Sequence, residues 1–475
     1  MSQFQLILKQ ETFALAVNAI EMSTTRPFDK ADGQKQDDDP FASEFMLDKM
    51  VAQAEQFKLT PRFDFLNIPY DNHQEYYFMF PDAWHIETPV VVETPQFITK
   101  TVYSLYKMVQ AQAMERLMHA FGLEDKWYAR LAKFAIFDII FTLYAGGLTH
   151  EIAGHGWRSK ESGNDRSYSL NLFKGEFGQG AVTKVAPNHT VFQDLLCTVE
   201  GTASTQNASK LSYKDMRING GDHIKAHYYL DTKWDITAYI WIWNNPNWSL
   251  VPGQDFKEDF QGSSDQMGDI SSYWFGSGSL RYQELLDKGY LPEEISRLGL
   301  YKGPGFSFWT IYMGALWNFV DPTAIYLAYQ MGNYVINGDD KFAVPDYLPR
   351  TNYYMTPYGS WYEASMPFYI KDAVMEAGIH TTANTEGLEQ SAGGWIELQN
   401  LRLQPHKYAR FDMGGKLHVF NLRGKWGALF ETSIVYSPLD TVGIGGKIGY
   451  KPKDAYLPGY PMDSLIWGID IVLRY

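Results

Sequence analysis

The chain has little of what several large protein classes depend on. It holds one cysteine, Cys197, among 475 residues, so no disulfide framework can form within it, and Cys197 in its apolar stretch is expected to pack as a small hydrophobic residue. Basic residues are outnumbered, 41 to 55, and the net charge of −14 argues against nucleic acid as a partner. No segment offers about 18 uninterrupted apolar residues, so a membrane-spanning helix is not predicted.

The most informative stretch that is present is His150-Glu151-Ile152-Ala153-Gly154-His155. It follows an apolar run, residues 134–148, that holds one charged residue, Asp138. Two histidines with a glutamate beside the first are what a catalytic zinc site needs, because neutral imidazoles bind the metal and the carboxylate handles a proton of the attacking water. The segment therefore predicts a zinc site on a buried helix.

The spacing of the two histidines is unusual. They lie five positions apart, whereas the common zinc-peptidase helix places them four apart on one face. On a regular helix five positions leave the two side chains roughly 140° apart. Both imidazoles reach one metal only if the helix is locally widened, as in a π-bulge, and such bulges favour functional sites. We therefore predict a π-bulge here, eased by Gly146, Gly147 and Gly154.

The six residues resemble the H-E-x-x-G-H motif of the dipeptidyl peptidase III family, a zinc peptidase family within the broader gluzincins. The resemblance covers this motif alone. It implies that His150 and His155 are metal ligands, that Glu151 is the general base, and that a glutamate from a downstream helix is the third ligand. Glu200, on the apolar segment 191–204, fits that third position.

The residues after Glu200 resemble the E-x-x-A-D pattern of some gluzincins, with Ser204 where the pattern has aspartate. That aspartate orients a zinc-binding histidine from outside the ligand set. Because it is absent here, Asp194 is the candidate to replace it.

Gluzincins also supply a histidine or tyrosine beyond the third ligand, which hydrogen-bonds the oxyanion. His223, His227 and Tyr228 are the candidates for this role. The competing interpretation is an ordinary helix that carries surface histidines.

Beyond about residue 350 the hydrophobic period becomes two, as in Tyr362, Ala364 and Met366 alternating with Glu363 and Ser365. About eight such segments are separated by turn residues. The last segment has apolar residues at alternate positions before a terminal aromatic: Leu465, Trp467, Ile469, Ile471, Leu473 and then Tyr475. This end resembles the closing strand of bacterial outer-membrane β-barrels, which is apolar towards lipid. A soluble antiparallel sheet also alternates and is the alternative.

These patterns predict an α+β protein in three parts. Residues 1–98 form an N-terminal extension with a polar segment expected to be mobile, residues 99–345 a mostly α-helical zincin-like domain, and residues 350–475 an antiparallel C-terminal β-barrel of about eight strands. The aromatic content of 16% suits a membrane interface. The predicted location is the bacterial outer membrane, with lipid as a partner. The first 22 residues lack the pattern of a signal peptide, which we expect to have been removed.

The function predicted from the sequence is zinc-dependent hydrolysis of a peptide bond in a peptide or protein substrate. Zn²⁺ on His150, His155 and Glu200 would activate water, and Glu151 would act as the base. Two other classes remain open. One is a non-catalytic outer-membrane channel or binding protein whose helices plug the barrel, and the other is a soluble metallohydrolase with a β-domain for recognition.

Overall fold

The computed structural model describes residues 95–161, 166–170, 181–185, 191–242, 308–371, 373–383, 391–406, 409–422, 424–439, 442–453, 455–462 and 464–473, with a few single positions between 273 and 294. The predicted N-terminal extension and its polar segment lie outside these ranges as far as residue 94. The described helices and strands all belong to one compact unit.

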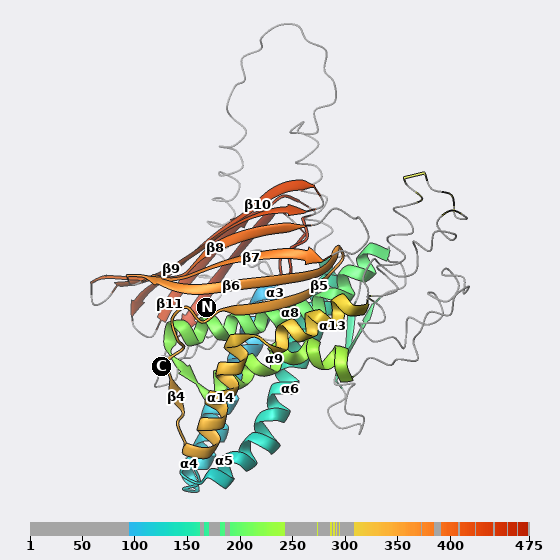
Figure 1. Cartoon of the computed structure of the whole chain (residues 1–475). Coiled ribbons are helices and arrows are strands. Elements are labelled where there is room, and N and C mark those ends of the chain that lie inside the picture. The colour runs from blue at the N-terminus through green and yellow to red at the C-terminus, as the bar shows by residue number, and fades with distance from the viewer. Residues whose placement is uncertain are drawn as a thin grey trace, which may run out of the picture. The chain divides into compact units, whose positions relative to one another are not determined.

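The first half of the described chain is helical (Figure 1). One continuous helix comprises α3 (Pro95–Met108), η1 (Val109–Glu115) and α4 (Arg116–Ala120), where η marks a π-helical stretch. A second comprises α5 (Trp127–Lys133), η2 (Phe134–Asp138), α6 (Ile139–Leu148), η3 (Thr149–Gly156) and α7 (Trp157–Glu161). The hairpin β1 (Arg166–Leu170) and β2 (Ala181–Val185) precedes α8 (Val191–Asn219), β3 (Gly221–Asp222), α9 (His223–Ile242), α13 (Phe308–Phe319), α14 (Pro322–Asn337) and β4 (Lys341–Phe342). The change from helix to strand falls at residues 338–350, as the change of period predicts.

The second half is one antiparallel sheet in which each strand pairs with its neighbours in sequence. The strands are β5 (Arg350–Thr356), β6 (Gly359–Ile370), β7 (Ala373–Ala383), β8 (Ala392–His406), β9 (Ala409–Leu422), β10 (Lys425–Leu439), β11 (Val442–Tyr450) and β12 (Leu465–Leu473). The prediction of about eight C-terminal strands is confirmed. The prediction of a closed barrel is wrong, because β5 and β12 stand at opposite ends of the strand order and do not pair with each other in the described sheet.

Helices occupy the β5 edge, where closure would place another strand. Asn318 in α13 accepts a hydrogen bond from the Tyr353 N–H at 3.0 Å, and Asp321 accepts one from the Thr351 N–H at 3.0 Å. Lys233 of α9 donates to the carbonyl of Thr351. These side chains satisfy edge groups that a further strand would otherwise bind, so the sheet can end at β5 with this edge covered.

The face of the sheet that packs on the helices combines an apolar cluster, with Trp361, Phe420 and Leu429, and buried charged side chains, whereas the exposed face is mostly apolar. One face packs on the helices, where Lys210 and Lys214 of α8 form ion pairs with Glu363 and Glu397 at 2.5 and 3.1 Å. Other polar side chains of the sheet are also buried: Glu376, His380, Thr382, Gln399 and His418. The large side chains exposed on the sheet are mostly apolar, among them Trp426, Phe430, Ile434, Ile444, Ile448, Leu465 and Ile469. A soluble antiparallel sheet normally buries its apolar face.

One helix within the described ranges, Trp127–Ser159, is long and apolar enough to cross a membrane by length and composition alone. The sequence analysis, which predicted no membrane-spanning helix, did not single out this candidate. That prediction required an uninterrupted apolar run, whereas this helix includes two charged residues, Lys133 and Asp138, beside and within its apolar stretch. Less than a third of the apolar window is buried, so residues 134–148 do not form the fully buried helix that the sequence suggested.

Candidate metal centre

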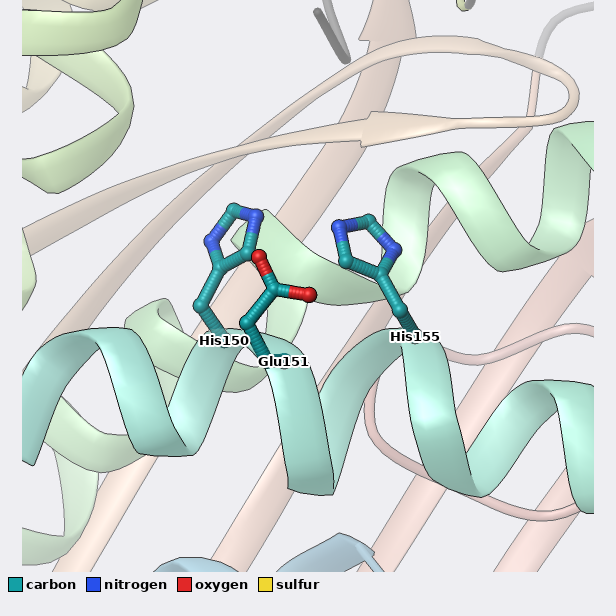
Figure 2. Close-up of side chains that lie close together, drawn as sticks. All are labelled: His150, Glu151 and His155. Atoms are coloured by element: carbon teal, nitrogen blue, oxygen red, sulfur yellow. The ribbon is translucent and has the colours of Figure 1, made fainter. Parts of the chain in front are cut away.

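The motif forms a π-helix. η3 covers Thr149–Gly156, and His150, Glu151 and His155 are all buried within it. Because a π-helix bonds residue i to residue i+5, positions five apart come onto the same side of the helix. Figure 2 shows the two imidazole rings side by side above η3, with the Glu151 carboxylate beside them. The ring centroids are 4.8 Å apart, and the π-bulge predicted from the spacing is confirmed.

These three side chains can hold a metal ion. One ligand atom from each lies within 4.8 Å of the other two, the one such group in the described part of the chain. Ligands on a tetrahedral zinc with bonds of about 2.1 Å stand about 3.4 Å apart, so small rotations of the side chains are needed to close the group. Two imidazoles and a carboxylate are donors that zinc accepts.

The Nδ1 atoms of both histidines have hydrogen-bonding partners of the kind found around metal sites. Nδ1 of His155 lies 2.7 Å from the carbonyl oxygen of Cys197 in α8. A carbonyl can only accept, so this nitrogen carries the proton and Nε2 carries the lone pair. Nδ1 of His150 lies 3.4 Å from Asp235 of α9, and Thr205 donates to the same carboxylate oxygen at 2.9 Å. Such contacts fix the tautomer and orientation of ligating histidines.

Glycine allows α8 to approach the imidazoles closely. A Cβ atom at position 201 would lie 2.6 Å from Nε2 of His150 and 2.6 Å from Nε2 of His155. At position 154 a Cβ would lie 2.5 Å from the Cα atom of Gly201. Only glycine fits these two positions, which pack the backbones of η3 and α8 against each other. Both Nε2 atoms therefore lie against Gly201 of α8, where the absence of a side chain leaves space for them.

Glu200 is not in the group that His150, Glu151 and His155 form, and its predicted role as the third ligand stays a prediction. One carboxylate oxygen accepts from Arg158 Nη2 at 2.5 Å and from the Tyr456 hydroxyl at 3.3 Å. The other accepts from the Gly459 N–H at 3.0 Å. Arg158 and Glu200 are both completely buried, and a buried guanidinium needs a carboxylate partner. Glu200 therefore fastens α7 and α8 to the segment between β11 and β12.

The three residues predicted to bind the oxyanion have other partners in the structure. His223 stacks on Tyr334 at 3.7 Å and contacts Glu115 at 3.0 Å and Asp340. Burial and Lys133 oppose its protonation, but Asp340 and Glu115 raise its pKa to about 9. The interpretation of His223 as a surface histidine is wrong, because it is buried in an ionic cluster, and its role at the oxyanion stays a prediction.

His227 and Tyr228 belong to the packing of α9. His227 Nδ1 lies 3.0 Å from the Thr142 hydroxyl, and burial lowers its pKa to about 4. The Tyr228 hydroxyl lies 3.3 Å from that of Thr149, the residue before His150, and its ring packs between Tyr103 and Tyr106. Tyr228 thus contacts the start of η3.

Sequence reasoning missed the acidic residues of α9. Asp231 and Asp235 are four positions apart, which places them on one face of a helix. Asp235 faces His150, and Asp231 Oδ2 would lie 3.0 Å from a Cβ at Gly146. Burial and the charge of Asp235 raise the pKa of Asp231 to about 8. In the sequence, the i, i+4 spacing of Asp231 and Asp235 on an apolar helix is the pattern that could have indicated them. The side chain of Asp194, the predicted orienting residue, lies outside what the structure describes.

In comparisons with known proteins, no family model, no curated protein and no solved structure matches this chain. The resemblance to the dipeptidyl peptidase III motif stays a prediction that rests on six residues.

Proposed function

We propose that this protein is a zinc-dependent hydrolase that cleaves peptide bonds at a membrane, and that η3 is its active-site helix. The observation that carries the proposal is the π-helix, which brings His150, Glu151 and His155 together. Both histidines have their Nδ1 atoms engaged by other groups, so their Nε2 atoms are the ones directed to an ion. π-Helical turns occur mostly where function requires the altered geometry.

His150 and His155 would hold the ion through Nε2. When bound, zinc would supply a Lewis acid that polarises a carbonyl and acidifies water. Glu151 would accept a proton from the attacking water at its carboxylate and return it to the leaving amine. Asp235, the Cys197 carbonyl and Gly201 would hold the two imidazoles in place. Among the described residues, His150, Glu151 and His155 are the one group of histidine, cysteine and carboxylate side chains that can hold a metal ion.

The membrane location is supported by the sheet. Its exposed face carries Trp426, Phe430 and Ile448, with 75%, 58% and 56% of each residue exposed, while Glu363 and Glu376 are buried on the other face. An exposed apolar face is stable against the hydrocarbon of a bilayer, whereas its exposure to water is unfavourable. The bacterial outer membrane is the proposed compartment, on the pattern of the last strand.

A second candidate function follows from the position of Glu151. Because its carboxylate lies in the same group as the imidazoles, it can be a ligand instead of a base. The ion would then be structural, in a non-catalytic membrane protein whose helices fill the concave side of the sheet.

The experiment compares the metal content and peptidase activity of the full chain with those of His150→Ala and Glu151→Gln. Under the proposal, His150→Ala loses zinc, and Glu151→Gln keeps zinc but no longer cleaves fluorescein-labelled casein. His119→Ala is the matched control, because the His119 side chain is 83% exposed and lies outside the group. Loss of zinc in Glu151→Gln, with no casein cleavage by the parent protein, would favour the structural ion. Full zinc content in His150→Ala would refute both functions.

A further inference from the structure

The helix that carries the motif has an exposed apolar face along its first two thirds. Ile136, Ile140 and Leu143 recur every three or four positions and form one stripe, with exposed fractions of 54%, 46% and 51%. Further large apolar residues widen this stripe: Trp127, Tyr128, Leu131, Phe137 and Ile139. Only from Thr149 onward are most of the side chains of this helix buried.

The opposite side of the same helix is polar and buried. Lys133 forms ion pairs with Asp138 and Glu115, both at 2.9 Å. Arg130 donates to the carbonyls of Val335 and Ile336 at 3.1 and 3.0 Å, at the end of α14. A helix of a water-soluble bundle has the reverse arrangement, with the apolar stripe inside and the charges outside.

The neighbouring helices α14 and α13 also have exposed apolar faces. In α14, Ile325, Tyr329 and Ile336 lie on one face and are more than half exposed. In α13, Met313 and Leu316 are exposed on a similar stripe, which Val320 continues just after the helix ends. Figure 1 shows α14 and α5 side by side, and Arg130 joins them. The exposed residues of α5, η2, α6 and α14 are called the helical apolar face below.

We propose that the helical apolar face lies in the acyl chains of a lipid bilayer, with Trp127 and Tyr128 at the interface. The inverted polarity of the α5–α6 helix identifies lipid as the occupant, because its ion pairs point inward and its large apolar side chains point out. The exposed apolar residues of α14 lie beside this helix and extend the same surface. A protein-docking patch would instead interrupt a polar surface. The helix from Trp127 to Ser159 has 33 residues, and about 20 suffice to cross the hydrocarbon. Charged residues at 124–126 precede the two aromatics, the order typical of a membrane boundary.

This surface is separate from the exposed face of the sheet, and it places the metal centre at one end of a lipid-facing helix. His150 follows Leu143 by seven positions, about 10 Å along a helix. The inference concerns the lipid contact of the helices and stands whether or not η3 binds zinc.

The test places a fluorescent label at single cysteines of the full chain. Cys197→Ala removes the native thiol, and Ile140→Cys, Ile325→Cys, Lys126→Cys or Ile448→Cys adds one exposed site. Each variant is labelled with a nitrobenzoxadiazole dye and reconstituted in phosphatidylcholine vesicles, with or without bromine on the acyl chains. Labels at 140 and 325 should lose more than half of their emission in the brominated vesicles, and the label at 126 should lose little.

Equal emission in both vesicle types at 140 and 325 would overturn the inference. A blue-shifted emission without bromine quenching, together with crosslinking between copies through position 140, would show that a second copy covers the face and would also overturn it. Quenching at 448 but not at 140 or 325 would refute the helical contact while leaving the proposed membrane location intact. A second substitution, Ile136→Cys, repeats the test if Ile140→Cys melts at a lower temperature than the parent.

Discussion

The two helices that pack around the motif contribute to it in opposite ways. α8 approaches with its backbone, through the absent side chain of Gly201 and the carbonyl of Cys197. α9 approaches with carboxylates, Asp235 beside His150 and Asp231 beside Gly146. We infer that α8 determines the space available to the two imidazoles and that α9 supplies negative charge beside them. Substitutions in the two helices should therefore fail in different ways.

The largest effect is expected from filling the space at Gly201. In Gly201→Val the Cβ atom would lie 2.6 Å from both Nε2 atoms, closer than atoms can pack. Because Gly154 packs η3 directly on the backbone at Gly201, the clash is relieved only by separating η3 from α8. We expect loss of zinc binding and a lower melting temperature, measured by metal analysis and thermal unfolding.

Gly147→Ala is the matched control, because a Cβ there meets no atom within 4 Å. Replacing a helical glycine by alanine stabilises by about 1 kcal/mol where space allows, and zinc content should stay the same. Stoichiometric zinc in Gly201→Val would show that α8 does not shape the site.

The next largest effect is expected on stability, from a substitution of Glu200, whose carboxylate pairs with Arg158. Glu200→Gln removes one of the two carboxylates that pair with the buried Arg158 guanidinium, the other being that of Glu161, and costs up to about 3 kcal/mol of unfolding free energy. Zinc affinity of the folded protein should not change. Denaturant unfolding and competition with a chelator measure the two quantities.

Arg402→Gln provides the comparison for Glu200→Gln, because Arg402 is 39% exposed and its partner Asp412 keeps a second ion pair with Arg410. Such exposed pairs contribute at most about 1 kcal/mol. A fall in zinc affinity in Glu200→Gln with unchanged stability would support Glu200 as a ligand, as the sequence predicted.

A smaller effect is expected on the α9 side. Asp235→Asn weakens the acceptor for His150 Nδ1, and loss of such a contact lowers metal affinity by about 10- to 100-fold. Asp231→Asn, one turn away on the same face, should leave zinc affinity unchanged. Asp235→Glu should recover part of the loss, since it restores the carboxylate. Equal affinities in Asp235→Asn and Asp231→Asn would refute the charge role of α9.

Local geometry at the motif could be predicted from sequence because spacing determines it. Because His155 lies five positions after His150, a helix can bring both imidazoles to one metal only if it is locally widened, and the structure has such a π-helix. The strand alternation after residue 350 was equally direct, since period two separates Glu363 from Met366 onto opposite faces. In both cases the information lies within a few neighbouring residues.

Tertiary choices could not be predicted in the same way. Glu200 has the residue type and helix expected of a third ligand, but a buried Arg158 competes for it, and no local pattern reveals that competition. Barrel closure depends on whether β5 meets β12, and it fails because Asn318 and Asp321 bind the β5 edge. Asp235 reaches His150 across 85 positions, so only its i, i+4 relation to Asp231 was visible beforehand.

The smallest expected effect is a pH dependence of the free energy of unfolding that comes from Asp231 of α9. The pKa of Asp231 is raised to about 8 from an ordinary value of 3.8. Between these values the folded protein binds a proton that the unfolded chain has released. The stability that Asp231 contributes is therefore complete below about pH 4 and is lost as the pH rises towards about 8. Zinc-free protein should lose about 1 kcal/mol of unfolding free energy between about pH 6 and about pH 7 through this residue.

Asp231→Asn removes that titration, so its stability relative to the parent should increase with pH over the same window and then level off. Denaturant unfolding in the presence of a chelator, repeated at each pH, measures the difference. Asp125→Asn, at an exposed acid, should show no such trend. A difference between parent and Asp231→Asn that stays constant with pH would mean that Asp231 is ionised beside Asp235. The face of α9 would then carry two negative charges towards η3 at neutral pH, and Asp231 would compete with Asp235 for the proton of His150.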